Sequence, residues 1–334
     1  MAGRKTNLAL LFLLGTAFAT GVLAYAIGGA WVRWVVVAHG IAGLAIVALA
    51  PWKGAIARRG LRRPRPGRAT SILLVVLVVA SVITGIVHAT GLVRVVGTFA
   101  PLGLHVGTSL AAIAVAVAHM FRRPVRPRAA DLSRRTLVRA GGVVAGASVL
   151  FGSVEGALWL TGARGAHRRS TGSHEVGSFA PDAMPVTQWF DDSVPRVDVD
   201  RWRLRLVGPG HDRLIDRAEL DRFSDGIRAT LDCTGGWYAE QDWEGVRVDH
   251  LVHGAQGSSF VVRSATGFAR RFPLADAPGL LLATRVAGQP LSAGHGAPLR
   301  LVAPGRRGFW WVKWITAIEV DDAPWWWQPP FPLT

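Results

Sequence analysis

Long apolar runs fill the first half of the chain, and they restrict its fold more than any other feature. Five of them lie at residues 8–29, 30–50, 70–93, 99–121 and 141–161. Each is close to the length of about 20 residues that a helix needs to cross a bilayer. A helix also satisfies its backbone hydrogen bonds within one segment, which a membrane requires. The sequence therefore predicts an N-terminal bundle of about five transmembrane helices over residues 1–162.

The charge of the chain is concentrated in this apolar half. Residues 1–140 contain 18 Lys and Arg and one acid, Asp131, a net charge of +17, whereas residues 141–334 contain 20 Lys and Arg and 21 acids, a net charge of −1. The overall charge of +16 therefore comes from segments between apolar runs and not from a basic domain. This distribution argues against a nucleic-acid partner and favours a membrane protein.

The positions of the basic residues predict an orientation. Seven Lys and Arg lie within residues 53–68 and seven within 122–139, and two more precede the first run. The opposite loops contain only Arg33 and Arg94. Because cytoplasmic loops of membrane proteins are enriched in Lys and Arg, the N-terminus and both basic segments are expected in the cytoplasm. Five crossings then place the C-terminal domain on the outer, periplasmic side of the cytoplasmic membrane.

A paired arginine precedes the last apolar run. Residues 133–139 read Ser-Arg-Arg-Thr-Leu-Val-Arg and resemble a twin-arginine export signal, which agrees with an exported C-terminal domain. An ordinary basic anchor at the cytoplasmic surface is the alternative.

Four histidines, His39, His88, His105 and His119, lie within the apolar runs. Ionisable residues are costly inside a membrane and are candidates for function. The predicted topology places His39, His88 and His105 in the outer half, where two of them on different helices could ligate one haem b. Such a haem would exchange electrons with a quinone or a separate redox protein. The ligand pair stays open, and hydrogen bonding to neighbouring helices is the alternative role.

A change of composition separates the two halves of the chain. Residues 163–179 are rich in Gly, Ser, Arg and His, which is typical of a flexible linker, and His174 is expected to be solvated there. Residues 180–334 contain many short alternating segments and few helical ones. They predict a second domain that is α+β and mainly β.

Cys233 is the single cysteine of the chain. It follows the alternating apolar residues Ile227, Ala229 and Leu231, which predict a strand, and it precedes Gly235-Gly236, where the backbone can turn. A thiol at the end of a strand suits a nucleophile or a ligand for a soft metal. A small buried apolar side chain is the alternative reading.

The sequence around Cys233 resembles a known family. Cys-x-x-Gly-Trp at 233–237 and Trp-x-Gly-Val at 243–246 are similar to the cysteine segment of the sulfite oxidase family of molybdopterin enzymes, which includes the bacterial methionine-sulfoxide reductase catalytic subunit. Further similar motifs occur in order at 202–208, 295–302 and 312–315. The resemblance covers roughly residues 180–322.

The resemblance implies an enzyme and a set of site residues. It implies that Cys233 binds the molybdenum of a molybdopterin cofactor, and that the metal performs two-electron oxygen-atom transfer on a small sulfur-type or related substrate. Other cofactor contacts are implied for Thr187, Gln188, His295, Arg300 and Lys313. The arginine that sulfite oxidases place before the His-Gly pair is replaced here by Ser292-Ala293-Gly294. A non-catalytic membrane binding or sensor protein with a degenerate domain is the alternative function.

Overall fold

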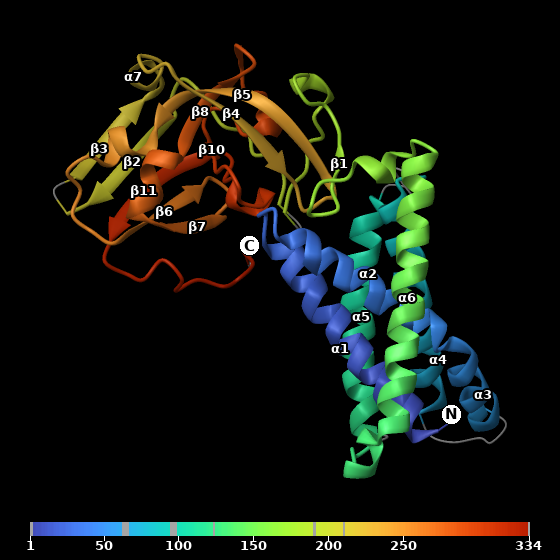
Figure 1. The fold of residues 1–334 in the computed structure, drawn as a ribbon. Coiled ribbons are helices and arrows are strands. Elements are labelled where there is room, and N and C mark those ends of the chain that lie inside the picture. Colours follow the sequence, from blue (N-terminus) through green and yellow to red (C-terminus); the bar gives the residue numbers. More distant parts are fainter. Residues whose placement is uncertain are drawn as a thin grey trace. The chain divides into compact units, whose positions relative to one another are not determined.

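The computed structural model describes residues 3–61, 67–93, 99–122, 124–189, 192–209 and 211–332 (Figure 1). The chain divides into two compact units. The first contains residues 1–25 and 30–174, and the second contains residues 26–29 and 175–334. The boundary after residue 174 falls inside the segment 163–179 that the sequence predicts as a linker.

The first unit is helical. Its helices are α1 (Arg4–Ala26), α2 (Val32–Ala48), α3 (Ala50–Leu61), α4 (Arg68–Thr90), α5 (Pro101–Arg122) and α6 (Arg134–Leu160). Within the described residues, α1, α4, α5 and α6 are each long and apolar enough to cross a membrane. A fifth span results if α2 is counted together with residues 50–58, which bend away from it by 41°. The predicted helical region with about five spans is confirmed as four to five helices of this kind.

The predicted spans differ from the helices by a few residues at their ends, and two of the differences concern how a span is built. The run predicted at 30–50 is interrupted after Ala48, because Pro51 lacks an amide hydrogen and its ring clashes with the carbonyl one turn before it. Pro51 lies in the first turn of α3, where a proline is tolerated. The run predicted at 141–161 begins earlier, because α6 includes the basic residues from Arg134 onward. The arginines of the charge argument that lie outside the described residues are Arg62, Arg63, Arg65, Arg94 and Arg123.

Small side chains bring the helices of the first unit together. Ala42, Ala45 and Ala147 are buried with Leu13 and Ile46 in one cluster, so α1, α2 and α6 pack closely there. Many large apolar side chains of the same helices face outward instead, for example Phe12, which is 73% exposed. Water solvates a surface of this kind poorly, whereas lipid would cover it.

The segment predicted as a flexible linker contains ordered elements. A 3-10 turn spans Arg164–His167, and the two-residue strand β1 spans His174–Glu175. The prediction that His174 is solvated is wrong, because its side chain is buried and its Nε2 lies 2.7 Å from the carbonyl oxygen of His88. That carbonyl belongs to the last turn of α4, where it also accepts a hydrogen bond of 3.1 Å from the Gly91 amide.

The second unit is built from two sheets (Figure 1). One follows the order β1, β5 (Trp237–Arg247), β8 (Leu281–Val286) and β10 (Arg300–Val302), with β4 (Asp225–Asp232) on β5 and β9 (Gln289–Pro290) on β8. The other follows the order β3 (His211–Asp216), β2 (Arg203–Gly208), β11 (Ile315–Asp321), β6 (Ser259–Ser264) and β7 (Ala269–Pro273). The β2–β11 pair is parallel and its neighbours are antiparallel. The predicted mainly β domain is confirmed.

Short helices and a continuous core complete this unit. Helix α7 (Arg217–Leu220) begins after Asp216, whose carboxylate accepts a hydrogen bond of 2.9 Å from the Glu219 amide. Helix α8 spans Val248–Val252. Side chains such as Trp243 and Phe260 are fully buried in one apolar cluster that includes residues from both sheets. The core therefore holds the ends of the strands in fixed positions.

Candidate active site

Cys233 lies in the tight loop between β4 and β5. Its amide donates to the Trp237 carbonyl at 2.9 Å, and its own carbonyl accepts from the Gly236 amide at 3.1 Å. Gly236 has a φ of 87°, a conformation that a side chain would disfavour. The Gly235 amide lies 3.3 Å from the Cys233 sulfur. The two glycines therefore close the hairpin and give the sulfur a backbone donor.

A buried ion pair fixes this loop from the other side. The Arg307 guanidinium donates to the Asp232 carboxylate, and its second terminal nitrogen lies 3.3 Å from the Cys233 carbonyl. The two charged side chains are 1% and 5% exposed. Gly308 follows Arg307, and a Cβ there would lie 3.0 Å from the Cα of Cys233. The Cys233 loop therefore rests directly on the backbone at 307–308.

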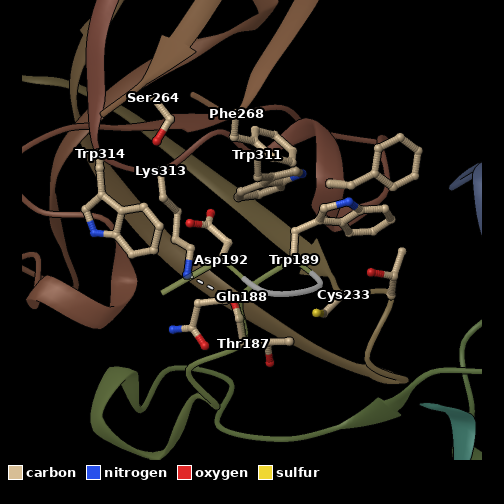
Figure 2. Close-up of a pocket in the computed structure, with 13 residues that line it drawn as sticks. Thr187, Gln188, Trp189, Asp192, Cys233, Ser264, Phe268, Trp311, Lys313 and Trp314 are labelled. Atoms are coloured by element: carbon tan, nitrogen blue, oxygen red, sulfur yellow. Dashed lines mark hydrogen bonds between the residues drawn. The ribbon is translucent and has the colours of Figure 1, made fainter. Parts of the chain in front are cut away.

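The sulfur lies at a cleft with about 460 Å³ of space, part of which is open to solvent (Figure 2). Aromatic side chains form much of its wall, and several polar side chains lie between them. The lining residues are Thr187, Gln188, Trp189, Asp192, Cys233, Thr234, Ser264, Phe268, Gly308, Phe309, Trp311, Lys313 and Trp314. The sequence places four of these at the cofactor, namely Thr187, Gln188, Cys233 and Lys313, and the structure brings all four to one cleft.

Burial controls the chemistry of the thiol. It raises the pKa of Cys233, while the Gly235 amide, Arg307 and Thr187 act in the opposite direction. Without a metal the sulfur is therefore expected to keep its proton at neutral pH. A metal ion would displace that proton, because the thiolate is the form that binds metals.

Lys313 brings a cation to the opposite wall. Its Nζ donates to the carbonyl of Thr187 at 2.9 Å and to the carbonyl of Gly294 at 3.0 Å, and it lies 4.5 Å from the centre of the Trp314 ring (Figure 2). Burial and the nearby Arg300 lower the pKa of Lys313 to about 7, against opposing effects of Cys233 and Asp192. The ammonium is thus poised to bind an anion or to release a proton near neutral pH.

The loop that contains Thr187 and Gln188 is tied to the cysteine hairpin. The Thr187 hydroxyl accepts a hydrogen bond of 3.1 Å from the Trp237 indole nitrogen. The Thr187 carbonyl accepts from Lys313, so one residue links both walls of the cleft. The sequence predicted only cofactor contacts for Thr187 and Gln188, and it did not predict these hydrogen bonds.

Arg300 and His295 lie behind the wall and do not line the cleft. Arg300 is 3% exposed, and its guanidinium donates to the His295 carbonyl at 3.0 Å and lies over the Trp243 and Trp311 rings. Both His295 ring nitrogens are engaged, Nδ1 with the Ser292 hydroxyl at 2.9 Å and Nε2 with the Met184 carbonyl at 3.0 Å. In this arrangement His295 supports the wall from within the protein.

The charges around the cleft fit an anionic cofactor. No carboxylate of the described residues lies within ion-pair distance of Arg300, and the Nε of this buried guanidinium has no hydrogen-bond partner. A buried cation of this kind is costly unless an anion compensates it. Burial and the nearby positive charge of Arg300 also lower the pKa of Lys313. A pterin phosphate would supply the missing negative charge, and Arg and Lys donors suit it.

The metal would need ligands beyond the protein. In the part of the chain that the structure describes, no group of three or more His, Cys, Asp or Glu side chains is placed to hold a metal ion. Cys233 would therefore be one ligand, and the cofactor would supply the others.

Sequence reasoning missed several residues of the cleft. Asp192, Trp311 and Phe309 line it, and the Asp232–Arg307 pair fixes the cysteine. The one feature of the sequence that points to a role for Asp232 is its position directly before the single cysteine. The last strand, β11, begins only at Ile315, and a 3-10 turn at Gly308–Trp310 precedes it. The irregular backbone before Ile315 carries Trp311 and Lys313, both of which line the cleft.

Comparisons with known proteins agree with this site. A family model described as the oxidoreductase molybdopterin binding domain matches residues 191–327. The mitochondrial sulfite oxidase of Macaca fascicularis is 30% identical over 167 residues, which cover 38% of this chain and 30% of that protein. The uncharacterized oxidoreductase YuiH of Bacillus subtilis (strain 168) is 28% identical over 148 residues, which cover 39% of this chain and 72% of that protein.

Among solved structures, the sulfane dehydrogenase SoxCD from Paracoccus pantotrophus has 24% identity over 39% of this chain and 40% of that chain. The TM-score is 0.37, which is too low to support an argument. The match to the Macaca fascicularis protein leaves more than two thirds of its length uncovered. The matched residues nevertheless include Cys233 and the cleft residues from Asp192 onward. The second unit of this chain is therefore a sulfite oxidase-type, molybdopterin-binding oxidoreductase domain.

Proposed function

We propose that the chain is a membrane-anchored, outward-facing oxidoreductase that transfers an oxygen atom to or from a small sulfur-type substrate. The observation that carries this proposal is the position of Cys233, whose sulfur lies at an aromatic cleft with Lys313 on the facing wall and Arg300 behind it. The molybdenum cofactor, bound through Cys233, supplies the two-electron oxygen-atom transfer. In the oxidising direction, substrate and one water yield the oxygenated product, two protons and two electrons.

The side chains of the cleft have separate roles in this proposal. Cys233 holds the metal, while Arg300 and Lys313 compensate the negative charge of the cofactor. Thr187 and Gln188 contact the cofactor from the facing loop, which the Trp237 indole holds in place. An anionic cofactor beside Lys313 would raise the pKa of its amine again and keep the side chain in its charged, donating form.

The wall before His295 favours a substrate that is not strongly anionic. Gly294 occupies the position where the resemblance would place an arginine, and a Cβ there would lie 2.7 Å from a methyl carbon of Val186. A longer side chain cannot enter at this point unless Val186 moves. The cleft instead presents aromatic rings such as Trp311 and Phe268. These surfaces suit a small uncharged sulfur compound better than a dianion.

The anchoring and orientation are part of the same proposal. Basic residues on one side of the apolar helices support a cytoplasmic N-terminus, and the paired arginines Arg134 and Arg135 at the start of α6 resemble a twin-arginine export signal. The outer domain would then be exported with its cofactor already in place. Electrons would cross to a quinone or a separate redox protein through a haem b in the helices.

Metal analysis of the full chain tests the proposed chemistry. Protein purified in detergent from a host that makes molybdopterin is expected to contain about one molybdenum and one pterin per chain. Cys233→Ser should lose the sulfur-to-metal charge-transfer absorption, whereas Thr230→Ser on the same hairpin should keep it. Reduced and oxidised dyes, offered with thioethers, sulfoxides and sulfite, then identify substrate and direction. Absence of molybdenum would contradict the proposal and leave a non-catalytic membrane binding or sensor protein.

A further inference from the structure

Two histidines of the first unit meet across helices. His39 on α2 and His105 on α5 have ring centres 5.7 Å apart, with their planes at 89°. Both rings are half-buried within the unit. The sequence named both as haem candidates together with His88, and it left the pair open.

Both rings are held by the same kind of hydrogen bond, from Nδ1 to a backbone carbonyl of a neighbouring helix. The Nδ1 of His39 lies 2.8 Å from the Ala17 carbonyl on α1, and the Nδ1 of His105 lies 2.8 Å from the Ser81 carbonyl on α4. A hydroxyl stands beside each contact, from Thr20 at 3.3 Å and from Ser81 at 3.4 Å. A carbonyl can only accept, so each Nδ1 carries the hydrogen and each Nε2 keeps its lone pair. Among the described residues, neither Nε2 has a hydrogen-bond partner.

A glycine makes room for each ring. Gly21 lies one turn after Ala17, and a Cβ there would come within 3.1 Å of the His39 ring. Gly85 lies one turn after Ser81, and a Cβ there would come within 2.9 Å of the His105 ring. Each histidine therefore receives a carbonyl and a glycine from one neighbouring helix, spaced four residues apart. Four helices thus fix two imidazoles that are not bonded to each other.

We infer that His39 and His105 are the two axial ligands of one haem b. This inference rests on the proposed electron route, and it names the site through which electrons pass. Two neutral imidazoles without a third protein ligand suit a haem, since the porphyrin supplies the remaining four nitrogens. An imidazole nitrogen binds a transition metal at about 2 Å, so rings on opposite sides of one metal have centres about 6 Å apart. In metal sites, the ring nitrogen of a histidine that does not bind the metal usually donates a hydrogen bond that orients the ring. Each Nδ1 makes such a bond here.

The redox step at this iron balances with the proposed reaction. Each two-electron oxidation of substrate would reduce the iron from Fe(III) to Fe(II) twice, one electron at a time. Each electron would leave to a quinone or a separate redox protein before the next arrives. In the reducing direction the same carriers would supply the electrons.

His88 and His174 form a second pair of rings, which differs from the first in the nitrogen that is bonded. Its ring lies 5.2 Å from that of His174, centre to centre, with the planes at 89°. The Nε2 of His174, however, is directed to the His88 carbonyl at 2.7 Å, where it satisfies the end of α4. A ring that donates from Nε2 keeps its lone pair on Nδ1, and the buried Nδ1 of His174 has no hydrogen-bond partner among the described residues. The bonded nitrogen is therefore Nε2 in His174 and Nδ1 in His39 and His105, and the His88–His174 pair is the alternative site that the spectra of variants must distinguish.

Absorption spectra of the full chain, expressed with added haem precursor, test the assignment. The wild type is expected to show a low-spin, six-coordinate b-type spectrum with about one haem per chain in the pyridine haemochrome assay. His39→Ala and His105→Ala should each lose the low-spin bands, with imidazole restoring them wherever haem is retained. His88→Ala and His174→Ala should keep the bands and the stoichiometry.

Each of the other outcomes contradicts a specific part of the two proposals. Low-spin haem that survives in His39→Ala and His105→Ala but is lost in His88→Ala would assign the haem to the other pair. Haem-free wild-type protein with full molybdenum content would contradict both the ligand pair and the haem route, while the oxygen-atom chemistry of the outer domain would stand. Molybdenum-free protein with intact low-spin haem would leave the present inference in place and contradict the proposed chemistry.

Discussion

Arg307 holds Asp232, the residue before Cys233, in an ion pair that is almost completely buried. The same guanidinium also reaches the Cys233 carbonyl. The position of the Cys233 sulfur therefore depends on a charge from a segment more than 70 residues away in the sequence. Since one partner without the other would be an uncompensated buried charge, neither residue can be replaced independently.

We expect Asp232→Asn to destabilise the domain strongly. Removal of one partner of a buried ion pair costs about 3–5 kcal/mol, because the remaining charge stays buried without compensation. The measurement is the urea midpoint of the cofactor-free protein. Asp242→Asn is the matched control, since Asp242 pairs with Arg228 on the same hairpin but both side chains are exposed. Equal losses in the two variants would show that the buried pair has no special role.

Gly308→Ala should displace the cysteine loop without unfolding the domain. The new Cβ would lie 3.0 Å from the Cys233 Cα and 3.3 Å from the Asp232 carbonyl, so the loop must move by a few tenths of an ångström. Changes that misplace a metal ligand commonly lower metal affinity by about 10-fold or more. Molybdenum retained after dialysis measures the effect. Gly279→Ala, where a Cβ meets nothing within 4 Å, should retain wild-type molybdenum, and loss in both variants would remove the explanation.

The stability of the cofactor-free protein should depend on pH through Lys313. Its pKa falls from 10.5 to about 7 on folding, so between these values the unfolded chain binds more protons than the folded one. The free energy of unfolding therefore rises with pH across that window, and the penalty for the buried ammonium is complete below pH 7. Urea midpoints at pH 6.5 and pH 9 should differ more in wild type than in Lys313→Met. Identical differences in both proteins would refute this assignment.

Sequence patterns predicted the elements better than their contacts. The strand before Cys233 and the Gly-Gly turn follow from local chemistry, and the structure contains both. The resemblance also predicted that Thr187 and Lys313 contact the same cofactor as Cys233. The three residues line one cleft, although they are far apart in the sequence. Arg300 shows the limit of such reasoning, because a motif gives the residue type and the strand but not which side of a wall the guanidinium occupies.

The histidines show the same limit in the first unit. Hydropathy places His39, His88 and His105 in spans, but the choice of partner depends on which helices pack together. Carbonyls and glycines on α1 and α4 decide it, and they carry no signal in the sequence around the histidines themselves. His174 was expected in water because its neighbours are polar. Its burial follows from a long-range hydrogen bond to the His88 carbonyl at the end of α4, which local composition does not reveal.

Gly85→Ala should perturb the haem while it leaves the helices intact. The new methyl would lie 2.9 Å from the His105 Nδ1 and would compete with the Ser81 carbonyl for that space. We expect weaker haem retention or a mixture of low-spin and high-spin bands. Gly107→Ala on α5 is the control, because a Cβ there meets no atom within 4 Å. A wild-type spectrum in Gly85→Ala would show that the ring position tolerates the methyl and would weaken the proposed role of the glycine.

Arg300→Met separates a role in cofactor binding from a role in folding. In the cofactor-free protein the substitution removes a buried cation that has no carboxylate partner, and it also removes the hydrogen bond to the His295 carbonyl. The first change stabilises the fold and the second costs about 1–3 kcal/mol, so the urea midpoint should move little. The cofactor-loaded protein should instead lose pterin and molybdenum about 10-fold more readily, because the compensating charge is gone. Arg263→Met, which removes an exposed charge from β6, should change neither quantity appreciably. A large fall in the urea midpoint of cofactor-free Arg300→Met, together with normal molybdenum retention by the loaded variant, would contradict this prediction. Arg300 would then be a structural residue, and other cations would compensate the charge of the cofactor.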